Sequence, residues 1–270
     1  MGLIGRISAC IFLCIAILSV ISPALTRYSP NAIDLDSLRQ PPSLQHLMGT
    51  DNKGRDIFTR VLYGGRISIA VSVVAALLSM GIGLFVGLMS GYIGGKADTI
   101  FMALVDLILA FPSLLLAIGV SVLFPPGIYT VMIALSAVGW ASFARLMRGQ
   151  VLSLKESSFV EAARAVGCGD LRIVFVHLFP QCVPLALVMI GMKLGGYILT
   201  ESALSFLGLG AQPPTATWGS MISSNRAYIN SAPWMVLSPG IMIAVTALCF
   251  NLIGDEMRER FDIGNNRDIK

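Results

Sequence analysis

Long stretches without a charged residue alternate with short polar segments along this chain of 270 residues. The charge-free windows, together with the turn signal FPPG at residues 124–127, divide the apolar sequence into six segments. These segments cover residues 7–25, 67–91, 99–123, 128–147, 182–207 and 236–254. A membrane-spanning helix needs about 20 apolar residues, so each segment is long enough to cross a bilayer. The pattern therefore predicts an all-α integral membrane protein, built as a bundle of about six transmembrane helices.

The first apolar segment, residues 7–25, has two interpretations. A cleaved signal peptide also begins with a base followed by an apolar run, as Arg6 and the residues after it do here. However, the run of roughly 20 apolar residues is longer than a usual signal core, and no clear Ala-x-Ala site follows it. We therefore expect a retained membrane span.

Composition and charge agree with a membrane location. Hydrophobic residues make up 55% of the chain and charged residues only 13%, well below the roughly 25% of a soluble domain. The net charge of +4 suits contact with anionic membrane lipid, but no cluster of bases is interleaved with aromatic residues, so nucleic-acid binding is not expected. A cytoplasmic N-terminus would place eleven bases in inner segments and seven in outer ones, which favours both termini in the cytoplasm.

Four glycines recur at intervals of four residues: Gly83, Gly87, Gly91 and Gly95. On a helix they form one stripe of small residues that allows close approach of a neighbouring backbone. General glycine abundance, with 27 in the chain, is the alternative explanation. The strict register favours a helix–helix seam with a structural role.

Three ionisable residues fall at membrane depth: Asp106, Lys193 and Glu201. Such groups are costly in lipid and usually face protein or water. Lys193 and Glu201 are eight residues apart, which separates them by about 80° around a helix and two turns along it, so a direct pair is not expected. We expect ion pairs, with Lys193 meeting Asp106 or another subunit, or the wall of a water-lined translocation pathway. Direct contact with cargo is the alternative.

Two further features concern helix geometry. Pro112 lies inside the segment 99–123 and should kink that helix, either as a static bend or as one that moves during transport. In the loop at residues 49–68, Ile57, Val61 and Leu62 form a short apolar face with arginines around it. This pattern predicts a short helix at the membrane surface or over the pore, with a solvated charged face as the alternative.

The sequence shows no catalytic or metal-binding constellation. Its two histidines, His46 and His177, are far apart and lack partners at ligand spacing. The nearest approach to a phosphate-binding loop has Ser90 where that motif needs glycine and Ala97 where it needs a hydroxyl residue. We therefore expect no bound cofactor and no enzymatic activity in this chain itself.

One polar segment, SSFVEAARAVGCGDLRIVFVHLFP at residues 157–180, interrupts the apolar pattern. Glu161 suits the start of a short helix and Gly167 its end. A second short helix is expected from Asp170 until Pro180 stops it. The apolar and small residues of the first helix are Phe159, Ala162, Ala163 and Val166. They would be poorly placed in water, so we expect a partner protein to cover this helix–turn–helix pair on the cytoplasmic side.

The same segment carries a resemblance. EAARAVG, followed by HLFP, resembles the EAA loop of ABC importer permeases. Four other segments are similar, in order, to the C-type permease of the dipeptide, oligopeptide and nickel branch: GTDNKGRDIFTRVLYGGRIS, LILAFPSLLLAI, ESALSFLGLGAQPPTATWGSMI and FNLIGDEMRERFD. The likeness covers nearly the whole chain. The ending departs from the family pattern LRDxLDP, so no role for Arg258 or Asp262 is carried over.

The resemblance implies a permease subunit that forms half of a translocation pathway for peptides in the bacterial inner membrane. It also implies a second, distinct permease subunit, two ATP-binding subunits that hold ATP and magnesium, and an extracytoplasmic substrate-binding protein. The residues implied to couple this chain to an ATPase are Phe159, Glu161, Ala162, Ala163 and Gly167.

The implied organisation has three parts. Residues 1–66 hold the first span and an extracytoplasmic segment, residues 67–256 a five-helix core with the coupling loop at about 151–180, and residues 257–270 a cytoplasmic tail. A nickel or chelated-metal importer shares these motifs and remains an alternative. A stand-alone secondary transporter is a further alternative, although no internal repeat is visible.

Overall fold

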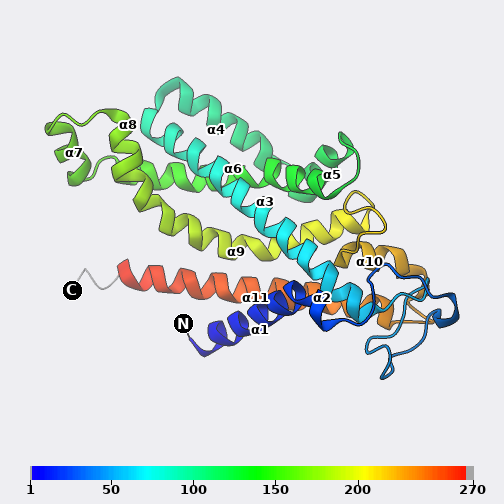
Figure 1. Cartoon of the computed structure of the whole chain (residues 1–270). Helices are drawn as coiled ribbons and strands as arrows, with labels where there is room; N and C mark the ends of the chain where they lie inside the picture. Colours follow the sequence, from blue (N-terminus) through cyan, green and yellow to red (C-terminus); the bar gives the residue numbers. More distant parts are fainter. Residues whose placement is uncertain (1, 266–270) are drawn as a thin grey trace.

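The computed structural model describes residues 2–265, with side chains through residue 260, and the chain is built from helices joined by loops. The longer helices are α1 (Leu3–Val20), α3 (Ile57–Ile93), α4 (Gly95–Ala110), α5 (Ser113–Val122), α6 (Ile128–Leu154), α9 (Phe179–Phe206) and α11 (Trp234–Asn265). The short elements are α2 (Ser22–Leu25), η1 (Leu35–Ser37), α7 (Ser158–Ala165), α8 (Asp170–Arg172), η2 (Ile173–Leu178), α10 (Trp218–Asn225) and η3 (Arg226–Tyr228). Figure 1 shows α7 and α8 at one end of the bundle, and α10 with the loop before α3 at the other.

The predicted bundle of about six spans is confirmed. Within the described residues, five helical units are long and apolar enough to cross a membrane: α1, α3, α6, residues 170–206 and α11. The sixth is the pair of α4 and α5, which bends by 98° between Ala110 and Ser113. Pro112 makes this break because it disfavours helical backbone at the residue before it, and Phe111 is extended. The expected kink is therefore a complete interruption of the helix.

The start of α3 corrects the expectation that Ile57, Val61 and Leu62, in the loop at residues 49–68, form a separate short helix. The Asp56 side chain accepts a hydrogen bond from the Thr59 backbone N–H at 2.8 Å and caps a helix that continues through Ile93. Ile57 and Val61 are buried against the α10 end of the bundle rather than lying on a membrane surface. No proline separates these residues from the span, so the helix does not stop.

The expected division of the chain also changes. The boundary at residue 66 falls inside α3, and the boundary at residue 256 falls inside α11. In addition, α1 packs on α11 with the Phe12 and Phe250 rings 4.5 Å apart, so the first span belongs to the same bundle. The side chain of Asp262 and the last part of the expected tail, residues 266–270, lie outside the described part of the chain.

Three of the four glycines predicted to form a seam do so, between α3 and α6. A Cβ added at Gly83 would lie 2.4 Å from Cβ of Phe143, and one at Gly87 would lie 2.6 Å from the Ala144 carbonyl oxygen. One at Gly91 would lie 2.9 Å from the α6 side chain facing it. These distances leave no room for a side chain, so the two helices approach as closely as glycine permits.

Gly95 is wrongly placed in the predicted seam. Helix α3 ends at Ile93, and both Gly94 and Gly95 have positive φ angles, 68° and 58°. No heavy atom lies within 4 Å of a Cβ added at Gly95. The regular spacing of the sequence therefore continues past the end of the helix, where glycine serves the turn into α4.

We expect Gly87→Ala to lower the free energy of unfolding by about 1–3 kcal/mol relative to Gly81→Ala, because it forces α3 and α6 apart. Gly81 is the matched control, since it lies on the same helix and an added Cβ there meets no atom within 4 Å. The measurement is equilibrium unfolding of the purified protein in detergent, followed by circular dichroism. Equal stabilities of the two variants would contradict the seam.

Candidate functional site

The end of α7 is shaped by a glycine in the left-handed region. Gly167 has φ +81°, and its N–H donates to the Arg164 carbonyl at 2.9 Å. The Cys168 N–H donates to the Ala163 carbonyl at 3.0 Å. This pair of hydrogen bonds is a Schellman cap, which satisfies the last carbonyls of the helix and turns the chain sharply toward α8. The predicted helix end at Gly167 is confirmed.

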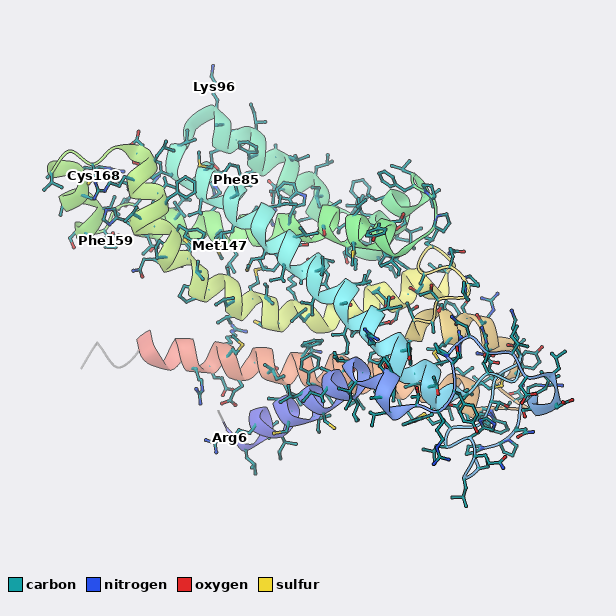
Figure 2. All side chains as sticks on the ribbon, in the orientation of Figure 1. Arg6, Phe85, Lys96, Met147, Phe159 and Cys168 are labelled. Carbon is teal, nitrogen blue, oxygen red and sulfur yellow. The ribbon has the colours of Figure 1, made fainter. Side chains whose placement is uncertain are left out.

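Helix α7 has one buried and one exposed face. Val160 is fully buried, whereas Val166 is 80% exposed. The exposed residues of the motif include Phe159, Glu161, Ala162 and Val166, and Figure 2 shows Phe159 at this end of the molecule. Ala163 was expected among them, but it is only 6% exposed and packs inward beside Val160. The exposed surface is therefore narrower than the motif suggests.

The buried face of α7 rests on a core to which several membrane helices contribute. The residues of this core outside α7 are Leu84, Leu88, Met147, Val151, Ile173, Val174, Leu178, Cys182 and Ala186. They come from α3, α6, η2 and α9, so α7 shares one hydrophobic cluster with these elements and contacts η2 most directly. A displacement of α7 must therefore disturb the packing of the bundle rather than of a loop.

The segment after α7 is not a second short helix that Pro180 ends. Asp170–Phe206 is one helical unit of 37 residues in which α8 leads through the π-helical turn η2 into α9. Pro180 lies in the first turn of α9, directly after the π turn, where the hydrogen bonds are re-routed. Its missing N–H is therefore tolerated. The segment beside α7 is thus a continuous extension of a membrane helix.

Polar contacts tie this end of the bundle together. The Tyr92 hydroxyl donates to an Asp170 carboxylate oxygen at 2.6 Å, and the Arg164 guanidinium lies 5.9 Å from the centre of the Tyr92 ring. These contacts connect the end of α3 with both α7 and α8. Nearby, Arg148 makes two 2.6 Å hydrogen bonds to the Asp98 carboxylate, which joins α6 to α4. Both sets of contacts link helices at the end of the bundle that carries α7.

The ionisable residues at membrane depth do not come together. Asp106 pairs with Arg145, so the expected pair between Lys193 and Asp106 is wrong. Lys193 makes no hydrogen bond or ion pair with the residues that the structure describes. Glu201 is 1% exposed and accepts hydrogen bonds from the Ser205 hydroxyl at 2.8 Å and the Ser202 hydroxyl at 3.2 Å. Glu201 is therefore packed inside the bundle rather than on an open wall.

Lys193 lines a cavity of about 190 Å³ beside the break between α4 and α5. Phe111 borders the cavity at the break, and Ser142 and Thr200 contribute hydroxyl groups from α6 and α9. The cavity combines an apolar wall, a few hydroxyls and one base, a composition typical of small-molecule sites. Of the three ionisable residues, only Lys193 borders this cavity.

Sequence analysis missed a buried charge cluster at the opposite end of the bundle. The Arg55 guanidinium donates to Asp51 at 2.7 Å, and His46 Nδ1 lies 2.9 Å from an Asp56 oxygen. All four side chains are buried, so the alternative of a solvated charged face does not hold at Arg55. The spacing of Asp51 and Arg55 around Gly54, with φ +72°, is the signal for a tight turn that closes this pair.

The sequence matches a family model over residues 83–262, described as the inner membrane component of binding-protein-dependent transport systems. It is similar to a putative peptide transport system permease protein of Brucella suis, 41% identical over 257 residues, which are 95% of this chain and 86% of the relative. It is also similar to the glutathione transport system permease protein GsiD of Pectobacterium atrosepticum, 42% identical over 86% of this chain and 77% of the relative. The oligopeptide transport system permease protein OppC of Bacillus subtilis is 38% identical over 96% of this chain and 85% of the relative.

Solved structures share the fold. Two crystal forms of the MetNI methionine ABC transporter in inward-facing conformations superpose with TM-scores of 0.59 and 0.61. The first covers 74% of this chain and 95% of the matched chain at 18% identity, and the second covers 75% and 97% at 19% identity. At this identity the likeness supports the arrangement of helices alone.

Truncation of valine to alanine should change the free energy of unfolding by different amounts on the two faces of α7. Val160→Ala should lower the free energy of unfolding by about 2 kcal/mol, because it removes buried methyl groups from the core under α7. Val166→Ala should change it by less than about 0.5 kcal/mol, because Val166 is exposed. Denaturant unfolding in detergent compares the two variants. A larger loss for Val166→Ala would show that the faces are assigned wrongly.

Proposed function

Because this chain belongs to the family of inner membrane components of binding-protein-dependent transport systems, we propose that it is the permease subunit of an ABC importer for short peptides. The relatives named for peptide, oligopeptide and glutathione transport support the peptide cargo. One structural observation carries the proposal: α7 exposes an apolar face at the tip of the bundle while its other face rests on the membrane helices. A membrane subunit that is driven by a separate ATPase needs a surface that the ATPase can bind and move.

The exposed face of α7 is the docking site for an ATP-binding subunit. Phe159, Ala162 and Val166 provide an apolar surface, and Glu161 adds a charge at its edge. A helix laid into a groove of a partner is a common mode of recognition. ATP and magnesium are held by that partner, and this chain contributes the surface that moves when the partner closes.

Movement of α7 is transmitted to the membrane-spanning helices through the helical elements packed beside it. The core under α7 includes residues of η2 and α9, and α9 continues the same helical unit across the bundle. A shift of α7 therefore tilts the helix that carries Lys193 at its centre. Binding of ATP drives transport only as far as it favours one of the two arrangements of the bundle over the other.

The coupling end lies in the cytoplasm. Figure 1 shows the start of α1 and the end of α11 on the side of the bundle that carries α7, and Figure 2 shows Lys96 at that end as well. Excess lysine and arginine on this side agrees with the orientation rule for inner membrane proteins. The opposite end, with α10 and the loop before α3, then faces the substrate-binding protein.

A second, related permease subunit completes the pathway. Lys193 borders a cavity at membrane depth without an acidic partner among the described residues, and an exposed base in lipid is costly. A neighbouring subunit placed against this face encloses the cavity and shields Lys193 from lipid. The cavity then forms part of the wall along which a peptide passes.

Gly167→Val should uncouple ATP hydrolysis from peptide uptake. A β-branched residue at φ +81° is strained by about 1–2 kcal/mol, which tilts α7 away from its docking position. We expect the number of peptides moved per ATP to fall about tenfold, the equivalent of 1.4 kcal/mol. The assay is uptake of a labelled dipeptide by proteoliposomes that hold the complete transporter, with ATP hydrolysis measured in parallel.

Gly169→Ala is the matched control for this experiment. Gly169 lies two residues further along the same turn with φ −70°, and an added Cβ there meets no atom within 4 Å. It should keep normal coupling. Normal coupling in Gly167→Val would refute the role of α7, and uptake of nickel in place of dipeptide would refute the cargo.

Lys193→Gln should lower dipeptide uptake about tenfold, because the pathway loses its charged hydrogen-bond donor. Assembly with the ATP-binding subunits should be unchanged, since Lys193 lies far from α7 along α9. Initial uptake rates and co-purification of the subunits test both expectations. Lys96→Gln, in the exposed first turn of α4, is the control base. Equal rates for both variants would remove Lys193 from the pathway.

A further inference from the structure

Two buried guanidinium groups share a single carboxylate at the end of the bundle opposite α7. Arg55 Nε donates to Asp51 Oδ2 at 2.7 Å, and Arg60 Nε lies 3.7 Å from the same oxygen. Arg55 is only 7% exposed, Arg60 5% and Asp51 1%. The other oxygen of Asp51 is occupied by the backbone N–H groups of Lys53 and Arg55, at 2.8 and 3.0 Å. Both oxygens of the Asp51 carboxylate therefore already accept hydrogen bonds within the protein.

No other acid among the described residues pairs with these arginines. Asp56 is the nearest candidate in sequence, but it contacts His46 and caps α3 through Thr59. Arg60 instead donates through Nη1 to the Pro30 carbonyl, a neutral partner, at 2.6 Å. Asp56 is buried nearby but contacts neither guanidinium group, so Arg55 and Arg60 have one carboxylate partner between them.

The two arginines border a cavity of about 200 Å³. Lys53 also borders this cavity. Its ammonium group makes no hydrogen bond or ion pair with the described residues, so it adds a positive charge to the cavity. Ser220 and Ser224 of α10 and Gln212 of the preceding loop provide neutral polar groups on the opposite wall. A concave site with converging donors and an excess of positive charge is built for a small anion.

A second observation comes from Asn52, which also borders the cavity. Its side-chain oxygen is buried and has no hydrogen-bond partner, although most buried polar atoms have one. A simple anion such as phosphate offers that acceptor little, since its oxygens are acceptors too. A ligand that carries a carboxylate and an adjacent N–H group satisfies both the arginines and Asn52. The C-terminal end of a peptide has this combination.

We propose that the cavity between residues 52–60, the end of α9 and α10 binds the C-terminal carboxylate of a peptide at the outer entrance of the permease. The guanidinium groups and Lys53 hold the carboxylate, and Asn52 accepts a hydrogen bond from the last peptide N–H. This site lies apart from the cavity that Lys193 borders, because the two cavities share no residue. The peptide identity of the ligand rests on the proposed function.

The test is calorimetric titration of the complete permease–ATPase assembly in lipid nanodiscs, without the binding protein, using trialanine and trialanine amide as probes. We expect trialanine to bind and its amide to bind at least about tenfold more weakly, since the amide lacks the charged acceptor. Lys53→Gln should raise the Kd for trialanine about threefold to tenfold and leave that for the amide unchanged. Arg55→Gln should have the larger effect on trialanine.

Two variants serve as controls. Arg27→Gln removes an exposed base in the same outer region that does not border the cavity, and it should bind trialanine as the wild type does. Arg55→Gln could misfold, because Arg55 pairs with buried Asp51. Lys53→Gln tests the site without this risk, because the Lys53 side chain is exposed and makes no hydrogen bond or ion pair with the described residues.

Several results would overturn the site. They are equal Kd values for trialanine and its amide in the wild type, no binding by the wild type, tighter binding of inorganic phosphate than of trialanine, or an unchanged Kd in Lys53→Gln. Weaker docking of the binding protein to Lys53→Gln, with trialanine binding intact, would assign these charges to a protein contact instead. If wild-type proteoliposomes import trialanine while the cavity fails to bind it, the site is wrong and the peptide importer stands. If the cavity binds trialanine but no peptide is imported, the proposed function fails and the site stands.

Discussion

The close contact between α3 and α6 is the constraint on which the rest of the bundle depends. At Gly83 and Gly87 the α6 backbone and Cβ atoms stand where a side chain of α3 would be. Helices in lipid gain little from apolar contact alone, because the lipid is apolar too, so close packing must hold them together. Directly beside this seam, Leu84, Leu88, Met147 and Val151 belong to the hydrophobic cluster that also includes Val160 and Ala163 of α7. The position of α7 therefore depends on how closely two membrane helices meet.

The two ends of the molecule have different chemistry, and long helices connect them. The end with α7 presents an apolar, partly exposed surface over a packed core, which suits a protein partner. The other end buries charges in tight turns and keeps a small basic cavity, which suits a small polar ligand. Helix α3 and the unit 170–206 each have 37 residues and reach from one end to the other. These long helices therefore link the two ends of the bundle directly.

Sequence patterns predicted elements whose cause is local. Charge-free windows located the six spans because a bilayer demands a minimum apolar length, and Gly167 marked the end of α7 because a left-handed turn favours glycine. Pro112 marked the break before α5 for an equally local reason. Patterns failed where packing decides. Pro180 does not end its helix because a π turn absorbs it, and Ala163, although part of a surface motif, is turned into the core.

The sequence alone determined that this chain spans a membrane about six times, that a short polar helix ends at Gly167, and that its motifs are those of an importer permease. Those properties depend on residue type and spacing along the chain. Tertiary structure alone decided which residues of α7 remain exposed, that Asp106 meets Arg145 rather than Lys193, and that Arg55 and Arg60 share one carboxylate. Each of these depends on segments that are far apart in sequence or on the facing of a turn, and no local pattern records which helix lies opposite.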